Sequence, residues 1–155
     1  GNGTETVVRS FRVINCNTNV ILILNLSVSG GLSTSLNSIP QGTGITIQAT
    51  QHVIISTVEI SECTYGVTVG TYFTAGGATV FLNDTTISGA TNRAVQCIGL
   101  NSIFCDSLDG NNNVVGLSAS YGGTITSNLQ TMTATTDQFI FAGFINKFRE
   151  RNYDS

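Results

Sequence analysis

The sequence predicts an all-β solenoid, in which short strands stack coil upon coil along one axis. Three observations favour this class. One apolar-alternating phrase returns along the chain about every 24 residues, a spacing typical of stacked repeats. Thr, Val and Ile dominate the apolar runs, and β-branched residues favour strands. Seventeen glycines accompany a single proline, Pro40, which indicates many tight turns and few rigid kinks.

Length and charge set further bounds. The chain has 155 residues, which suits one domain with a real core. Only 10% of the residues are charged and the net charge is −3, so a basic nucleic-acid footprint is absent from the sequence and no nucleic-acid partner is expected. The longest apolar run, Val20–Leu24, is far too short to span a bilayer, so no membrane insertion is expected.

The repeat divides the chain into three parts. Residues 1–19 are expected to form an initial strand and an N-terminal cap, and residues 20–143 the coils. The recurring phrases begin at Val20, Gly44, Gly66, Ala94, Val114 and Gln138. Alternation with a period of two places the second and fourth residues of a phrase on one face of a strand. We therefore expect these pairs to face inward: Ile45 and Ile47, Val67 and Val69, Val95 and Cys97, Val115 and Leu117, and Phe139 and Phe141.

A second strand follows in each coil about a dozen residues later. The segments "HVIISTVEI", "ATVFLNDTTI", "NSIFCDSL" and "GGTITSNLQTM" alternate in part, with Ile55, Leu82, Cys105 and Thr126 at matching places. Glycine-rich and Asn-rich turns such as "TAGG" and "DGNNN" separate the strands. Each strand is expected to pair in parallel with the same strand of the next coil, so the inward side chains stack into apolar columns.

The C-terminal residues 144–155, "FINKFRERNYDS", depart from the repeat. Phe144, Ile145 and Phe148 have helical spacing, which predicts a short amphipathic cap on the last coil. The alternative is a frayed tail or a linker to another domain. An uncapped last coil would expose unpaired backbone and invite edge-to-edge association.

This pattern resembles the right-handed parallel β-helix, here with about six coils and a short C-terminal cap. The segment "GVTVGTYFTAGGATVFLNDTTISGATNRAVQC" resembles the coils of bacteriophage tailspikes, tail fibres and other virion appendages, and the likeness extends over about residues 20–141. The right hand follows from that resemblance and from the general preference of parallel crossovers. Tailspikes are often homotrimers that recognise or cleave glycans, so the resemblance implies a homo-oligomer, with a trimer as one form.

Acidic residues are the first candidates for chemistry, since glycoside hydrolysis needs two carboxylates about 5 to 9 Å apart. Matching Leu82 to Cys105 stacks Asp84 over Ser107 on neighbouring coils. The ordinary interpretation is unrelated surface acids, and we expect no catalytic residue. A carbohydrate-active enzyme would have to use weak candidates among Glu59, Glu62, Asp84 and Asp106.

Aromatic residues near turns are the candidates for glycan or partner contact. Tyr65, Tyr72, Phe73 and Tyr121 fall at or near turns, where aromatic rings can stack on sugars or fill a partner's pocket. The alternative is that they pack over the corners of the coils.

Cysteines and histidine give little sign of a metal or nucleophile. The cysteines at positions 16, 63, 97 and 105 form no C-x-x-C pair, and His52 is the only histidine. Cys97 and Cys105 are expected to face inward as packed thiols. We expect no metal and no cofactor.

Two functions follow as expectations. The first is a non-enzymatic virion structural or adhesion module, serving assembly and host-surface attachment in the virion or the extracellular space. Its partners would be other virion subunits, further copies of itself and a host surface glycan. The second is a carbohydrate-active β-helix fragment, either a polysaccharide hydrolase or a lyase.

Overall fold

The computed structural model describes residues 7–8, 10–16, 20–29, 42–71 and 76–148. These residues form two parallel sheets and no helix. Sheet A contains β1 (Val7–Val8), β3 (Ile21–Ser29), β5 (His52–Ser61), β7 (Thr79–Ser88), β9 (Ser102–Asp109), β11 (Thr124–Asn128) and β13 (Phe144–Lys147). Sheet B contains β2 (Phe11–Ile14), β4 (Thr43–Gln48), β6 (Tyr65–Val69), β8 (Arg93–Ile98), β10 (Asn113–Ser120) and β12 (Ala134–Phe141).

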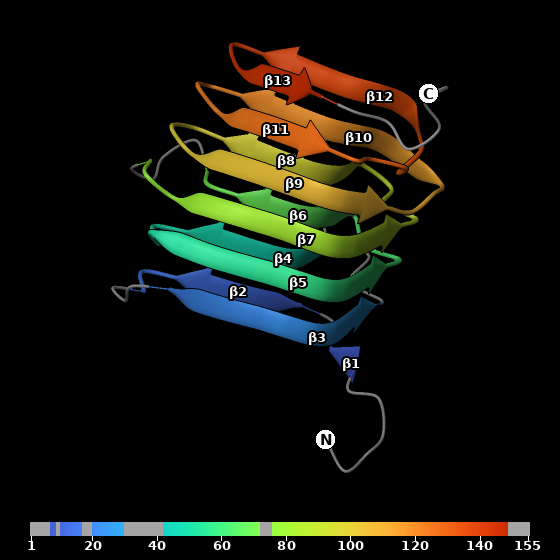
Figure 1. The fold of residues 1–155 in the computed structure, drawn as a ribbon, viewed down its shortest axis with the longest axis horizontal. Coiled ribbons are helices and arrows are strands. Elements are labelled where there is room, and N and C mark those ends of the chain that lie inside the picture. The colour runs from blue at the N-terminus through green and yellow to red at the C-terminus, as the bar shows by residue number, and fades with distance from the viewer. Residues whose placement is uncertain (1–6, 9, 17–19, 30–41, 72–75, 149–155) are drawn as a thin grey trace.

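The chain alternates between the two sheets, and each strand pairs with the strand two places along the sequence. In Figure 1 the strands of sheet A run to the right at the front, those of sheet B return behind them, and the stack advances from β1 to β13. This winding is right-handed, so the predicted fold class, an all-β right-handed parallel β-helix, is confirmed.

The register of sheet A agrees with the sequence pattern through three coils. Ile55 pairs with Leu82, and Leu82 with Cys105, as expected. The fourth position was predicted wrongly, because Ser127 and not Thr126 pairs with Cys105. Ser127 is fully buried, and its hydroxyl is satisfied by donating to Gln130 Oε1 at 2.9 Å, so a polar residue occupies the inward column.

In sheet B the expected column of Ile45, Val67 and Val95 is confirmed. Leu117 and Gln138 continue this column, so the expected Val115 and Phe139 do not. Gly116 takes the place held by Gly44 in the second coil. A Cβ at Gly44 would meet Gly66 O at 2.8 Å, and one at Gly116 would meet Asp137 O at 2.6 Å.

Two further sequence assignments change. The phrase beginning at Val20 leads into β3 of sheet A, whereas β2 is the strand that pairs with β4. Phe139 and Phe141 lie on the face opposite Ile140, which follows Ala119 and Cys97 in the inward column. Both rings are exposed, which corrects their assignment to the core.

Residues with left-handed backbone angles form a column that interrupts β3, β5, β7 and β9 of sheet A and continues at Leu129, just beyond the end of β11. Each of these residues breaks the in–out alternation by one position, since Ile55 and Val58 are both buried on either side of Thr57. The same corner recurs in the neighbouring coils, so the core continues around it. The φ angles are 52° at Asn25, 55° at Thr57, 45° at Asp84, 61° at Ser107 and 53° at Leu129.

The C-terminal segment differs from the expected helix. Phe144, Ile145 and Lys147 lie in strand β13, which pairs with β11. The helical spacing of the apolar residues was therefore coincidental in this segment. Residues 149–155 lie outside the described part of the chain, and their role as a cap or linker stays a prediction.

Candidate functional site

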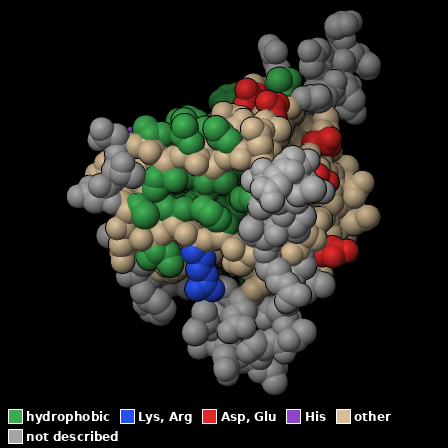
Figure 2. All heavy atoms as spheres, turned by 90° about the horizontal axis from the view of Figure 1, so that it is seen from below, with side chains coloured by type: hydrophobic (Ala, Val, Ile, Leu, Met, Phe, Trp, Pro, Cys, Tyr) green, Lys and Arg blue, Asp and Glu red, His purple; other side chains and the backbone are tan. Residues whose placement is uncertain are grey.

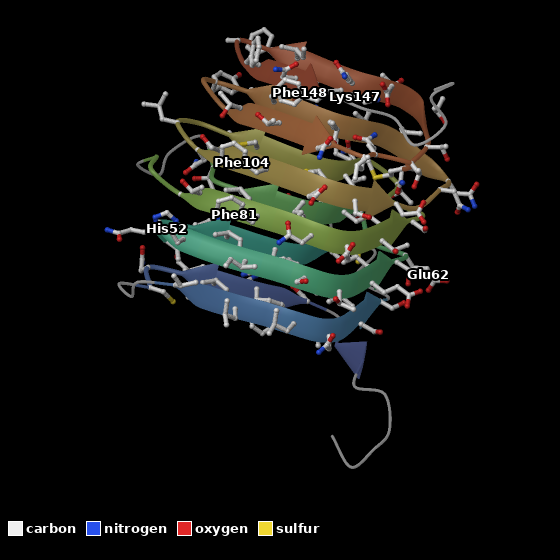
Figure 3. The ribbon with its side chains drawn as sticks, viewed as in Figure 1. His52, Glu62, Phe81, Phe104, Lys147 and Phe148 are labelled. Carbon is white, nitrogen blue, oxygen red and sulfur yellow. The ribbon has the colours of Figure 1, made fainter. Side chains whose placement is uncertain are left out.

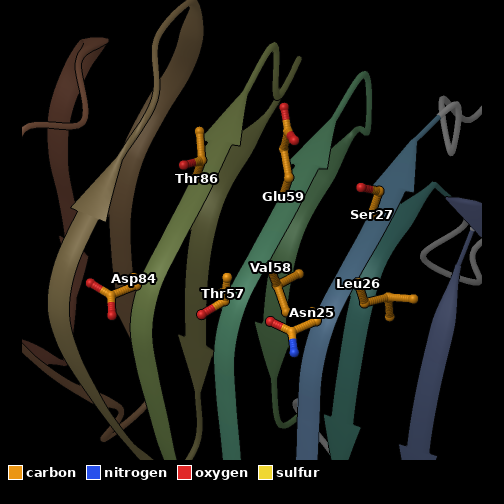
Figure 4. Close-up of a pocket in the computed structure, with 8 residues that line it drawn as sticks. All are labelled: Asn25, Leu26, Ser27, Thr57, Val58, Glu59, Asp84 and Thr86. Atoms are coloured by element: carbon orange, nitrogen blue, oxygen red, sulfur yellow. The ribbon is translucent and has the colours of Figure 1, made fainter. Parts of the chain in front are cut away.

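A hollow of about 220 Å³ lies on the outer wall of sheet A, over the column of left-handed residues. Figure 4 shows its lining on β3, β5 and β7: Asn25, Leu26, Ser27, Thr57, Val58, Glu59, Asp84 and Thr86. The hollow is smaller than the roughly 300 Å³ at which closed small-molecule pockets begin. Its hydroxyl, amide and carboxylate groups suit hydrogen bonding to a polar ligand laid across the coils.

The local fold explains why these groups gather. Thr57 and Asp84 occupy the corner position, where the left-handed backbone interrupts the pleat. Glu59 pairs in register with Thr86 two residues further along. The wall therefore presents a row of acceptors and hydroxyl groups across adjacent coils, about 4.8 Å apart. None of the hydroxyl or amide members was singled out from the sequence.

Two of the four candidate acids share this hollow. Glu59 and Asp84 lie on neighbouring strands, and the register places their Cα atoms on the order of 8 Å apart. Figure 4 shows the two side chains directed away from each other. The observed arrangement is a polar lining and not a converging carboxylate pair of the kind that cleaves glycosidic bonds.

The other two acids lie elsewhere. Glu62 is exposed at a left-handed corner beyond the end of β5. Asp106 is exposed on β9 and accepts a hydrogen bond from Asn128 Nδ2 at 3.4 Å on the next coil. The expected stacking of Asp84 over Ser107 is confirmed by the register on either side of them.

The candidate aromatic residues are not brought together. Tyr65 is half-buried at the start of β6, and its hydroxyl accepts a hydrogen bond from Asn92 Nδ2 at 3.0 Å. Tyr121 is exposed at the turn after β10 and packs edge-on against Phe141, with 5.3 Å between ring centroids. Tyr72 and Phe73 lie outside the described residues. Their contact role stays a prediction.

An aromatic pair missed by the sequence analysis lies on the same wall as the hollow. Phe81 and Phe104 stack on neighbouring coils and face outward from β7 and β9 (Figure 3). The signal was available, since each residue directly precedes an inward residue of the correctly matched pair Leu82 and Cys105.

Cys63, Cys97 and Cys105 are buried and form no nucleophilic site with the exposed His52. Cys97 and Cys105 are buried as expected, and loss of solvent raises the pKa of each thiol to about 12. His52 is exposed at the start of β5 (Figure 3), and Cys63 is buried with its thiol donating to Ser61 O at 3.3 Å. All four cysteines are free.

Two other kinds of site are absent from the part of the chain that the structure describes. No group of three or more His, Cys, Asp and Glu side chains there could hold a metal ion. No helix among these residues has the length and apolarity needed to cross a membrane.

Comparison with known proteins gave no match: neither a protein-family model, nor a curated protein, nor a solved structure is similar to this chain. No residue role is therefore carried over from a relative.

Proposed function

We propose that this chain is a non-enzymatic structural and adhesion module of a virion appendage, of the kind found in bacteriophage tailspikes and tail fibres. It would act at the virion surface or in the extracellular space, with other virion subunits and a host surface glycan as its partners. The observation that supports the proposal is a parallel β-helix whose neighbouring coils are joined by hydrogen bonds between Ser, Thr and Asp side chains.

Hydrogen bonds between coils tie this wall together. Ser61 Oγ donates to Ser29 Oγ at 3.1 Å, and Thr124 Oγ1 donates to Ser102 Oγ at 3.0 Å. Thr131 Oγ1 donates to Asp109 Oδ1 at 2.7 Å in the same manner. Such ladders stiffen the stack while leaving little charge on its surface, which favours contact with neutral glycans and with other subunits.

The hollow over β3, β5 and β7 is the proposed glycan contact. Sugar hydroxyl groups would donate to Glu59 and Asp84 and exchange hydrogen bonds with Thr57 and Thr86. The binding would be weak for one copy, since the hollow is small and open.

The alternative function is a carbohydrate-active fragment. One observation favours it: Glu59 and Asp84, both candidate acids, line the same hollow. A substrate would then have to draw the two carboxylates together, because they diverge in the free protein.

The test is incubation with a panel of purified bacterial surface polysaccharides, with binding and chain cleavage measured in the same samples. Binding that is lost in Asp84→Asn and retained in Glu62→Gln, with no new reducing ends or unsaturated sugars, supports an adhesive role. Cleavage that disappears in Asp84→Asn or Asp106→Ala would overturn it and favour the enzyme. Absence of binding to every polysaccharide would remove the glycan-contact part of the proposal.

A further inference from the structure

Among the described residues, each end of the coil stack combines an apolar surface with a strand edge that pairs with no further strand. Within the described residues, the N-terminal end of the stack is formed by β2 in sheet B and by β3 in sheet A, with the short β1 on part of β3. The C-terminal end is formed by β12 in sheet B and β13 in sheet A. Large apolar side chains at the two ends are 37–64% exposed: Phe11, Ile14, Val20, Leu22 and Leu24, and Phe139, Ile140, Phe141, Phe144 and Phe148. Figure 2 shows rows of hydrophobic side chains on the N-terminal end, bordered by a basic one.

The free edges of sheet A are complementary in length. Residues 145–147 of β13 lie in the same side-chain columns as Ile21–Ile23 of β3, as the register shows when it is followed through β11, β9, β7 and β5. β1 pairs with β3 only at Ser27 and Val28, so no strand in the described part of the chain pairs with this part of the β3 edge. A second copy could add its β13 there without displacing β1.

The edges of sheet B match in the same way. Residues 138–141 of β12 lie in the same side-chain columns as Phe11–Ile14 of β2, when the register is followed through β10, β8, β6 and β4. Stacking in this register places Ile140 on Val13 of the next copy and Phe141 on Ile14. The strands of the two copies pair in parallel only when the C-terminal end of one copy meets the N-terminal end of the other.

Charge is complementary at this contact as well. Arg12 is exposed on β2, and the register places it over Phe139 and diagonal to Asp137. The Asp137 side chain is 56% exposed and already accepts a hydrogen bond from Lys147 Nζ at 2.9 Å, so Arg12 of a second copy would be its second cationic neighbour. Phe139 already receives Arg93 on β8, with the guanidinium carbon 4.9 Å from the ring centroid. Arg12 of a second copy would repeat this cation–π contact from the other side and approach the Asp137 carboxylate.

We propose that this chain binds a second copy of itself head to tail, with β12 and β13 of one copy extending both sheets of the next at β2 and β3. Phe139, Phe141 and Phe144 together expose roughly 300 Å² of apolar surface. Since a stable interface needs about 800 Å² on each side, the contact is weak and concentration-dependent. Such a contact does not close on itself, so repetition produces a filament.

The test is the average mass in solution, measured by sedimentation velocity across a wide range of protein concentration. Two variants block one end each: Ile14→Lys with Leu22→Lys at the N-terminal end, and Ile140→Lys with Phe141→Lys at the C-terminal end. Each variant alone is expected to remain monomeric, with association at least tenfold weaker than in the unaltered protein. An equal mixture is expected to form a 1:1 dimer, since one free end of each kind remains.

The control is Leu100→Lys, which adds the same charge at a residue that is 74% exposed and lies on neither end. It is expected to associate like the unaltered protein. Circular dichroism checks that each blocked variant is folded, and Arg12→Glu, an exposed substitution, provides a second variant in which association should weaken. A monomer at all concentrations, or a mixture of blocked variants that stays monomeric while one of them dimerises alone, would overturn the proposal.

Discussion

The Phe81 ring stacks on the Phe104 ring of the following coil, with 5.4 Å between their centroids and 20° between their planes. The two residues are register partners on β7 and β9, in an outward column that also holds Ile54 and Thr126. The pair therefore couples two coils on the solvent side of sheet A, where most neighbouring side chains are small and polar. Its contribution can be separated from burial alone.

We expect a coupling free energy of about 0.5–1.5 kcal/mol between Phe81 and Phe104, because offset aromatic rings attract beyond the area they bury. The measurement is a double-mutant cycle of urea unfolding with Phe81→Ala, Phe104→Ala and both together. The control cycle uses Ile54 and Phe104, which lie in the same column with Phe81 between them. Equal coupling in the two cycles would show that the column acts as a whole and that the stacked pair has no special role.

Buried asparagines satisfy backbone groups at two different turns: Asn113 follows the turn from sheet A to sheet B, and Asn101 lies in the turn from sheet B to sheet A. Asn113 Oδ1 accepts from the Ala90 N–H at 3.0 Å, and its Nδ2 donates to Ile87 O at 2.9 Å. Asn101 likewise accepts from a backbone N–H of the previous coil, that of Ala78 at 3.0 Å, but its Nδ2 donates to Ile98 O of its own turn at 2.8 Å. Each side chain thereby replaces a ladder partner where the chain passes from one sheet to the other.

Asn113→Ala is expected to lower the free energy of unfolding by about 2–4 kcal/mol, because it leaves a buried donor and a buried acceptor without partners. Denaturant unfolding gives this difference directly. Asn111→Ala is the matched control, since Asn111 is exposed in the same loop, and its replacement should change stability by less than about 0.5 kcal/mol. A similar loss in both variants would contradict the assigned role.

The sequence predicted the fold class and part of the register, because a period-two alternation identifies the inward residues of a strand wherever those residues are apolar. Ile45, Val67 and Val95 were matched correctly for this reason. The pattern failed where a polar residue is satisfied inside, as at Ser127, and where the last coil leaves aromatic residues exposed, as at Phe141.

The candidate site was predicted only in part. Glu59 and Asp84 were singled out, and the structure places both in one hollow. The corner that creates the hollow could not be predicted, because its column contains Thr57 and Leu129, which rarely adopt left-handed backbone angles. Only Asn25 and Asp84 carry a side chain that favours this conformation.

The buried thiols make stability depend on alkaline pH. Burial raises the pKa of Cys97 and of Cys105 from 9.0 to about 12, so the unfolded chain loses these protons first as the pH rises. The contribution of the two protonated thiols to the free energy of unfolding is fully present below about pH 9 and is lost between pH 9 and 12. At pH 10 the loss is about 1 kcal/mol per thiol.

The measurement is the free energy of unfolding in urea at pH 8 and at pH 10. The control is a double variant that combines Cys97→Ala with Cys105→Ala. The variant should be less stable at both pH values, since it contains cavities, but its loss between the two should be smaller. An equal loss in both proteins would assign the alkaline sensitivity to other groups.

The last prediction concerns the corner of sheet A at Thr57, a β-branched residue with a φ of 55°. Thr57→Asn places there the residue found at the same corner in the previous coil, Asn25, and asparagine tolerates this conformation better. We expect the free energy of unfolding to rise by about 0.5–1 kcal/mol, as measured in urea. Thr86→Asn is the control, because Thr86 lies two residues beyond the corner of β7 and its replacement should be neutral or destabilising. A loss of stability in Thr57→Asn equal to that in Thr86→Asn would mean that the Thr57 side chain, through its contacts in the hollow, outweighs the backbone strain.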